Sequence, residues 1–119
     1  MEREQIEVSV TRLARAVEEY WLRLPDLIKV DIEKGEIGML EGARDLLERC
    51  RPFLLIELHG TNVGVGRILN DLGYNSYVLG NPQPITEARW DAVVVAAPKE
   101  DTQKCAKASS LAMSATLSR

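Results

Sequence analysis

The sequence has few cysteines, no excess of positive charge and no long apolar run, and each absence excludes a class of protein. Cys50 and Cys105 are too few and too far apart for a disulfide framework or a zinc site. The net charge is −3 and the isoelectric point is about 5.2, whereas a nucleic-acid-binding surface needs a basic face. No segment reaches the ~18 consecutive apolar residues that span a bilayer, and the first residues lack the apolar core of a signal peptide. We therefore expect a cytoplasmic protein with reduced thiols that binds neither nucleic acid nor membrane.

The apolar residues predict an alternation of strands and helices. The 119 residues suffice for one small domain, and an apolar fraction of 45% is ordinary for a globular core. Strands are expected at residues 6–10, 27–32, 53–58, 74–79 and 92–97, and helices at residues 12–24, 40–50 and 62–72. Such alternation predicts an α/β fold with a mostly parallel sheet and right-handed crossovers. The last connection has no obvious helix, which leaves open an antiparallel pairing of the last two strands.

The composition changes after Pro98. Residues 99–119 are mainly Ala, Ser, Thr, Lys and Gln, with few large apolar side chains to pack against a core. We expect this tail to be disordered or weakly helical, separate from a domain at residues 1–98.

Ionisable side chains follow two neighbouring apolar strands. Asp31, Glu33 and Glu36 come at the end of the strand at 27–32, and Glu57 and His59 end the next strand. In a parallel α/β sheet, ligands bind at the carboxyl ends of the strands. The sequence therefore predicts five titratable groups around one crevice.

Four of these five groups also have a purely structural explanation. Glu33 and Glu36 suit the first turn of a helix, where the macrodipole stabilises negative charge. Asp31 is a same-face neighbour of Lys29 and could form an ion pair with it. His59 could be a satisfied structural histidine, although its titration near neutrality suits a general base.

Two further kinds of site are weakly indicated. Asp31, Glu33, Glu57 and His59 could supply oxygen and nitrogen ligands to a divalent metal, but their spacing does not select one, and we assign no metal. The glycines at residues 60–66 have neither the spacing of a dinucleotide fingerprint nor the Lys-Ser/Thr of a phosphate loop.

The stretches PDLIKVDIE at 25–33, EIGMLEGARDLLER at 36–49 and RPFLLIELH at 51–59 together resemble the carboxyl-terminal half of the FkbM-type methyltransferases. The family pattern is Pro-Asp-Leu-Ile-Lys-x-Asp-x-Glu-Gly-x-Glu, then Leu-x-Gly-Ala, then Pro-x-Leu-x-x-Glu-x-His. The positions that match are Pro25, Asp26, Leu27, Ile28, Lys29, Asp31, Glu33, Glu36, Leu40, Gly42, Ala43, Pro52, Glu57 and His59. The resemblance covers about residues 8–98, and Lys34 stands where the family has glycine.

The resemblance implies a partial Rossmann-like methyltransferase sheet that carries methyl transfer from S-adenosylmethionine to a hydroxyl oxygen. Asp31 would lie beside the methyl donor or the acceptor, and Glu57 and His59 would line the pocket of a small-molecule or glycan acceptor, with His59 as a candidate base. Glu33 and Glu36 would shape the turn beside the substrate.

The family's main cofactor loop has no counterpart ahead of the strand at 6–10, because no Glu/Asp-x-Gly-x-Gly segment occurs there. We expect a truncated enzyme that binds S-adenosylmethionine weakly. The strand at 27–32 would then be an apolar edge, open to the strand at 6–10 or to a second copy. Two alternatives remain: a non-catalytic remnant that pairs through this edge, and a metal-dependent lyase or hydrolase.

Overall fold

A computed structural model of the chain describes residues 27–117, with side chains up to residue 114. The strand expected at residues 6–10 and the helix expected at 12–24 lie outside the described residues.

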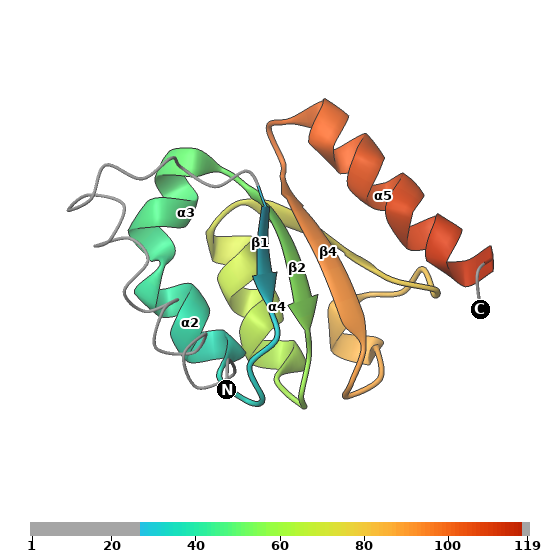
Figure 1. The fold of residues 1–119 in the computed structure, drawn as a ribbon, viewed down its shortest axis with the longest axis horizontal. Coiled ribbons are helices and arrows are strands. Elements are labelled where there is room, and N and C mark those ends of the chain that lie inside the picture. Colours follow the sequence, from blue (N-terminus) through green and yellow to red (C-terminus); the bar gives the residue numbers. More distant parts are fainter. Residues whose placement is uncertain (1–26, 118–119) are drawn as a thin grey trace.

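The described chain is an α/β fold with a mixed four-stranded sheet (Figure 1). In sequence order its elements are β1 (Leu27–Val30), α2 (Glu36–Gly42), α3 (Arg44–Cys50), β2 (Phe53–Glu57), α4 (Asn62–Asp71), β3 (Tyr74–Val78), the 3-10 turn η1 (Ile85–Glu87), β4 (Val93–Pro98) and α5 (Thr102–Leu117). No helix in this part of the chain is long and apolar enough to cross a bilayer.

The strand order is β1-β2-β4-β3, so the last strand in sequence lies inside the sheet. β1 and β2 are parallel, whereas β4 is antiparallel to both β2 and β3. The antiparallel pairing of the last two strands is therefore confirmed, and the sheet is mixed: among the described strands β1, β2 and β3 run in one direction, and β4 runs against them. β4 is buried almost throughout, as suits a strand that lies between two others rather than at an edge.

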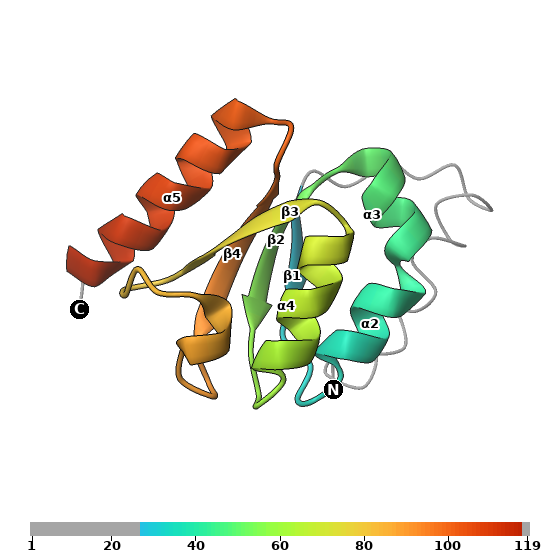
Figure 2. The same ribbon diagram turned by 180° about the vertical axis from the view of Figure 1, so that it is seen from behind.

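Helices cover the two faces of the sheet unequally. Side chains alternate along each strand, and those of Ile28, Val30, Leu54 and Ile56 face α2, α3 and α4 in the larger core. The opposite face carries α5 over a smaller core that includes Val95 (Figures 1 and 2). The carboxyl ends of β1 and β2 remain free of these layers, and the candidate site lies there.

The helix expected at residues 40–50 is two helices with a kink at Ala43. Ala43 has φ −101° and ψ 9°, outside helical geometry, and Gly42 precedes it. The backbone bonds from Ala43 N to Met39 O (3.0 Å) and from Leu47 N to Ala43 O (2.9 Å) still bridge the break. A glycine at this point weakens the helix and allows the kink.

The segment expected to be a disordered or weakly helical tail carries the 16-residue helix α5 in the structure. Its contact with the sheet uses small side chains, since Ala108 and Ala112 are buried. Small residues allow close approach of a helix to a sheet, a signal that a search for large apolar groups does not detect.

Arg51 connects the start of this last segment to the rest of the fold through hydrogen bonds. It ends α3 in the left-handed conformation, with φ 52°. Its guanidinium donates to both carboxylate oxygens of Glu100, at 2.7 and 2.8 Å, and to the carbonyls of Leu72 and Gly73. The hydrogen bond from Arg51 lowers the pKa of Glu100. Lys104 of α5 donates to the Arg51 carbonyl at 2.7 Å, so the helix is held at its first turn.

Candidate functional site

The parallel register of β1 and β2 brings three of the predicted site residues together. Leu27 pairs with Phe53 and the pairing continues to the ends of both strands, so Asp31 emerges beside Glu57. One ligand atom each from Asp31, Glu57 and His59 lie within 4.8 Å of one another. All three side chains are partly exposed, so the group opens to solvent.

The other two predicted residues lie differently. Glu33 is exposed and outside this group, and it acts on His59 through its charge alone. Glu36 has no exposed surface and lies behind His59 rather than in the opening. Within the described part of the chain, Lys29 is exposed and makes no ion pair with Asp31. The ion pair that would have explained Asp31 as a structural residue is therefore not formed.

Glu36 binds two side chains at once. Its Oε2 lies 2.9 Å from Nδ1 of His59, and its Oε1 accepts a hydrogen bond from the Thr61 hydroxyl at 2.6 Å. An ionised carboxylate only accepts hydrogen bonds, so this network assigns the proton of the neutral imidazole to Nδ1. Nε2 is then the accepting nitrogen, and it lies 3.9 Å from Oε2 of Glu57.

The environment of His59 favours its charged form. Burial of the ring lowers the pKa, but the hydrogen bond and charge of Glu36, with further help from Glu57 and Glu33, raise it above the ordinary 6.5. The site therefore stabilises the imidazolium relative to an ordinary histidine, and this is the state that a histidine base reaches after it has removed a proton.

The turn between β1 and α2 positions the Glu36 carboxylate. Gly35 N donates to the Ile32 carbonyl at 2.9 Å, and Lys34 adopts a left-handed conformation with φ 61°. Glu36 is consequently the first residue of α2, where the helix dipole favours a carboxylate. The glycine of the family pattern stands at the Lys34 position, and the positive φ explains why glycine suits it.

Thr61 is a site residue that the sequence alone did not identify. It occupies the capping position before α4. Its side chain makes no capping hydrogen bond but turns to Glu36 instead. A threonine two positions after the histidine at a strand end was the available signal.

The glycines that follow His59 serve helix packing rather than phosphate binding. A Cβ atom on Gly64 would collide with the Ile37 side chain of α2, and one on Gly66 would lie 2.9 Å from Cγ2 of Ile85. α4 therefore lies close to η1 at Gly66, and at Gly64 a larger residue would require the end of the Ile37 side chain to move. The weak resemblance to a glycine-rich phosphate loop has this packing explanation.

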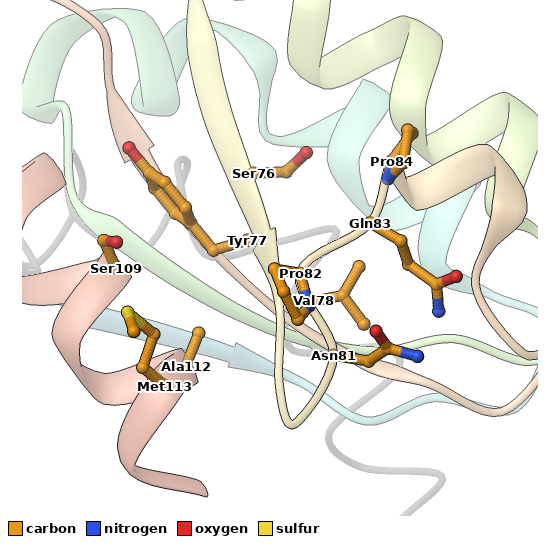
Figure 3. Close-up of a pocket in the computed structure, with 10 residues that line it drawn as sticks. All are labelled: Ser76, Tyr77, Val78, Asn81, Pro82, Gln83, Pro84, Ser109, Ala112 and Met113. Carbon is orange, nitrogen blue, oxygen red and sulfur yellow. The ribbon is translucent and has the colours of Figure 1, made fainter. Parts of the chain in front are cut away.

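Two of the cavities near the sheet lie at different distances from His59 in the strand order. One, of about 360 Å³, opens beside Thr61 at the end of the sheet that carries His59. The other, of about 440 Å³, lies at the β3 edge between Tyr77, the loop at 81–84 and Met113 of α5 (Figure 3). Because β4 separates β3 from β2, the second cavity is remote from His59 in the strand order.

The fold and site together define an α/β domain with a carboxylate-oriented histidine at the end of its parallel strand pair. A family model described as the methyltransferase FkbM domain matches residues 1–79, which is more than half of the chain. The chain belongs to this family. No curated protein and no solved structure matches it. The matched stretch includes Glu36, His59 and Thr61, whereas β4 and α5 lie beyond it.

Proposed function

We propose that the chain transfers a methyl group from S-adenosylmethionine to a hydroxyl oxygen of a small molecule or a glycan. Family membership supports methyl transfer. The observation that supports a hydroxyl acceptor is the 2.9 Å contact between Nδ1 of His59 and the fully buried Glu36. A hydroxyl needs a base to become a nucleophile, and this contact leaves Nε2 as a proton acceptor.

Each residue of the site would have a separate role in proton removal. Nε2 of His59 takes the proton from the acceptor hydroxyl, and Glu36 stabilises the imidazolium that results. Thr61 occupies the second oxygen of Glu36 and so keeps the carboxylate aimed at the ring. Glu57 and Glu33 add negative charge that supports the same protonation state.

The donor set at the ends of the two strands fits a cationic cofactor. S-adenosylmethionine would supply an electrophilic methyl group on a sulfonium cation. Asp31 and Glu57 place partly exposed carboxylates in the opening and are the residues we assign to the side of that cation. Weak binding of S-adenosylmethionine by this chain remains a prediction, which micromolar affinity in a calorimetric titration would contradict. The cytoplasmic location also remains a prediction.

The test is transfer of labelled methyl to a panel of hydroxyl compounds, with a comparison of His59→Asn and the original chain. Loss of a positioned base should lower the rate by about 10²–10⁴-fold. Glu41→Gln is the matched control, because this exposed carboxylate of α2 pairs with Arg44 and not with the site. Equal rates for His59→Asn and the original chain would exclude the proposed base.

A metal-dependent lyase or hydrolase is a second candidate, favoured by the 4.8 Å grouping of Asp31, Glu57 and His59. It conflicts with the first proposal, since Nε2 cannot both hold a metal and take a proton. A divalent ion bound by the folded state alone would raise the melting temperature. No shift with magnesium, manganese, zinc or calcium would remove this candidate.

Pairing of two copies through β1 is a separate proposal about assembly. Among the described strands, β1 has a neighbour on one side only, and Leu27 on it is 58% exposed. An open apolar edge is prone to pair with another strand. A sharp monomer peak with cooperative melting in size-exclusion and calorimetric experiments would contradict this proposal.

A further inference from the structure

Two large apolar side chains are exposed on one cavity beside the site. Trp90 is 62% exposed and Val63 is 59% exposed, and both line the cavity of about 360 Å³ that opens beside Thr61. Tryptophan is among the more buried residues of folded proteins, so an indole that stands free at a cavity calls for an explanation. Grouped exposed apolar side chains commonly mark a surface that binds something.

The backbone holds Trp90 firmly in this place. The antiparallel ladder of β2 and β4 continues past the strand ends, with bonds from Leu58 N to Ala92 O and from Gly60 N to Trp90 O, both 2.8 Å. Asn62 holds the residues that precede Trp90. Its amide nitrogen donates to the carbonyl of Arg89 at 3.1 Å and to the carbonyls of Ile85 and Ala88. Asn62 is only 9% exposed, so this clamp is part of the protein interior. The indole is thus carried on a rigid segment.

The cavity and the histidine share one carboxylate. Thr61 and Gly60 form part of the cavity wall, and Gly60 directly follows His59 in the chain. The Thr61 hydroxyl binds one oxygen of Glu36, and His59 binds the other. A ligand seated in the cavity would therefore extend along the rim of the sheet to the site.

The residues that line the cavity determine which kind of ligand it can bind. Among the described residues no charged side chain lines it. Its polar atoms are the hydroxyl of Thr86, the hydroxyl oxygen of Thr61 and the amide oxygen of Asn62, because the Thr61 proton is donated to Glu36 and the Asn62 nitrogen to backbone carbonyls. Glu33 and Glu57 add negative charge at the strand ends where His59 lies, and Arg89, beside Trp90, is paired with Asp91. A flat aromatic face with neutral hydrogen-bonding groups suits a neutral ring that has an apolar face and hydroxyl edges, and an anion would be disfavoured.

We infer that the Trp90 cavity binds a neutral sugar ring of a glycan acceptor, next to the unit whose hydroxyl reaches His59. This inference rests on the proposed function for the hydroxyl acceptor and narrows the acceptor to a carbohydrate. The stretch matched by the family ends at residue 79, so Trp90 is a feature of this chain outside that stretch.

The test is a calorimetric titration with neutral saccharides, without methyl donor. Methyl glucoside, cellobiose and maltose are the probes, and glucuronic acid is the charged counterpart. At least one neutral probe should bind saturably, and glucuronic acid should bind more weakly. Trp90→Ala should weaken binding by about tenfold, the factor that corresponds to roughly 1.4 kcal/mol of lost contact, whereas Trp90→Phe should retain part of it.

Leu111→Ala is the matched control, because Leu111 is similarly exposed at 53% but belongs to α5. It should bind saccharides as the original chain does. Absence of saturable binding by all three neutral probes, equal binding by Trp90→Ala, or equal binding of glucuronic acid would overturn the inference.

Different results would contradict the proposed methyl transfer and the proposed sugar site. Saccharide binding that depends on Trp90, without methyl transfer to any hydroxyl compound, would contradict the proposed function and leave the sugar site standing. Methyl transfer to non-sugar hydroxyls, with no saccharide binding, would contradict the sugar site alone.

Discussion

Nδ1 of His59 lies 2.9 Å from Oε2 of Glu36, a carboxylate with no exposed surface. The two residues come from different elements, 23 positions apart in sequence, and the turn after β1 and the end of β2 bring them together. This pair fixes the tautomer of the histidine and the direction of its second nitrogen. Most of the chemistry of the site can be tested through it.

The Glu36→Gln variant should lower the pKa of His59. Glutamine keeps the shape but removes the charge, and its NH2 group donates where one carboxylate oxygen of Glu36 accepts, so the interactions that raise this pKa are weakened while burial of the ring remains. His59 is the only histidine of the chain, so NMR titration of the imidazole signal reports it without ambiguity. Glu41→Gln should leave the titration unchanged, and an unchanged pKa in Glu36→Gln would show that Glu36 does not control the ring.

Stability should depend on pH through His59. The pKa of His59 is higher in the folded state than its ordinary 6.5, so the folded state binds this proton more tightly than the unfolded state. The stabilisation is fully present below about pH 6.5 and is lost as the pH rises through the higher folded pKa. Melting temperatures measured at intervals between pH 5.5 and 8, a range roughly around the histidine pKa, should therefore fall as the pH rises. His59→Gln should flatten this dependence, and an equal slope in both proteins would assign it to another group.

Lys34→Gly should stabilise the protein. Lys34 holds φ 61°, a conformation that costs a residue with a side chain roughly 1 kcal/mol or more. Glycine removes this cost but makes the unfolded chain more flexible, so a net gain of about 0.5 kcal/mol is expected from denaturant unfolding. Lys34→Ala retains the strained backbone and is the matched control. A loss of stability in Lys34→Gly would mean that the lysine side chain contributes more than its backbone costs.

Gly66→Ala and Gly38→Ala should change stability in opposite directions. Both positions are helical, so alanine gains about 1 kcal/mol of helix propensity at each. At Gly38 nothing lies within 4 Å of the added Cβ, and the gain should be realised. At Gly66 the Cβ would lie 2.9 Å from Cγ2 of Ile85, and overpacking costs about 1–3 kcal/mol. Urea unfolding of the two variants measures the difference. Equal stabilisation of both would show that η1 shifts to make room for the added methyl group on α4.

The sequence predicted most of the strands, because strand alternation and buried apolar runs are local signals. It did not predict the position of β4, since residues 93–98 read as a buried strand wherever they lie in the sheet. It also did not predict the extent of α5, whose contact depends on alanines and on Arg51, 49 positions away from Glu100. These are non-local features that no periodicity encodes.

The sequence predicted which ionisable residues lie at the strand ends better than it predicted how they are arranged. The ends of β1 and β2 carry Asp31, Glu57 and His59 as expected, because parallel strands bring their ends together. The division between the buried Glu36 and the exposed Glu33 was not predictable, since both read as acids in one turn. Only the three-dimensional turn at Lys34 decides which of the two points inward.

The position of β4 has a consequence for how the protein acquires its structure. Among the described strands, β3 pairs with β4 alone, so within this part of the chain it cannot join the sheet until residues 93–98 are available. A ribosome that has released only the first three strands presents a parallel pair and an unattached third strand. The described part of the sheet is therefore completed only when β4 has formed, and the hydrogen bond from Gly60 N to Trp90 O forms at the same stage.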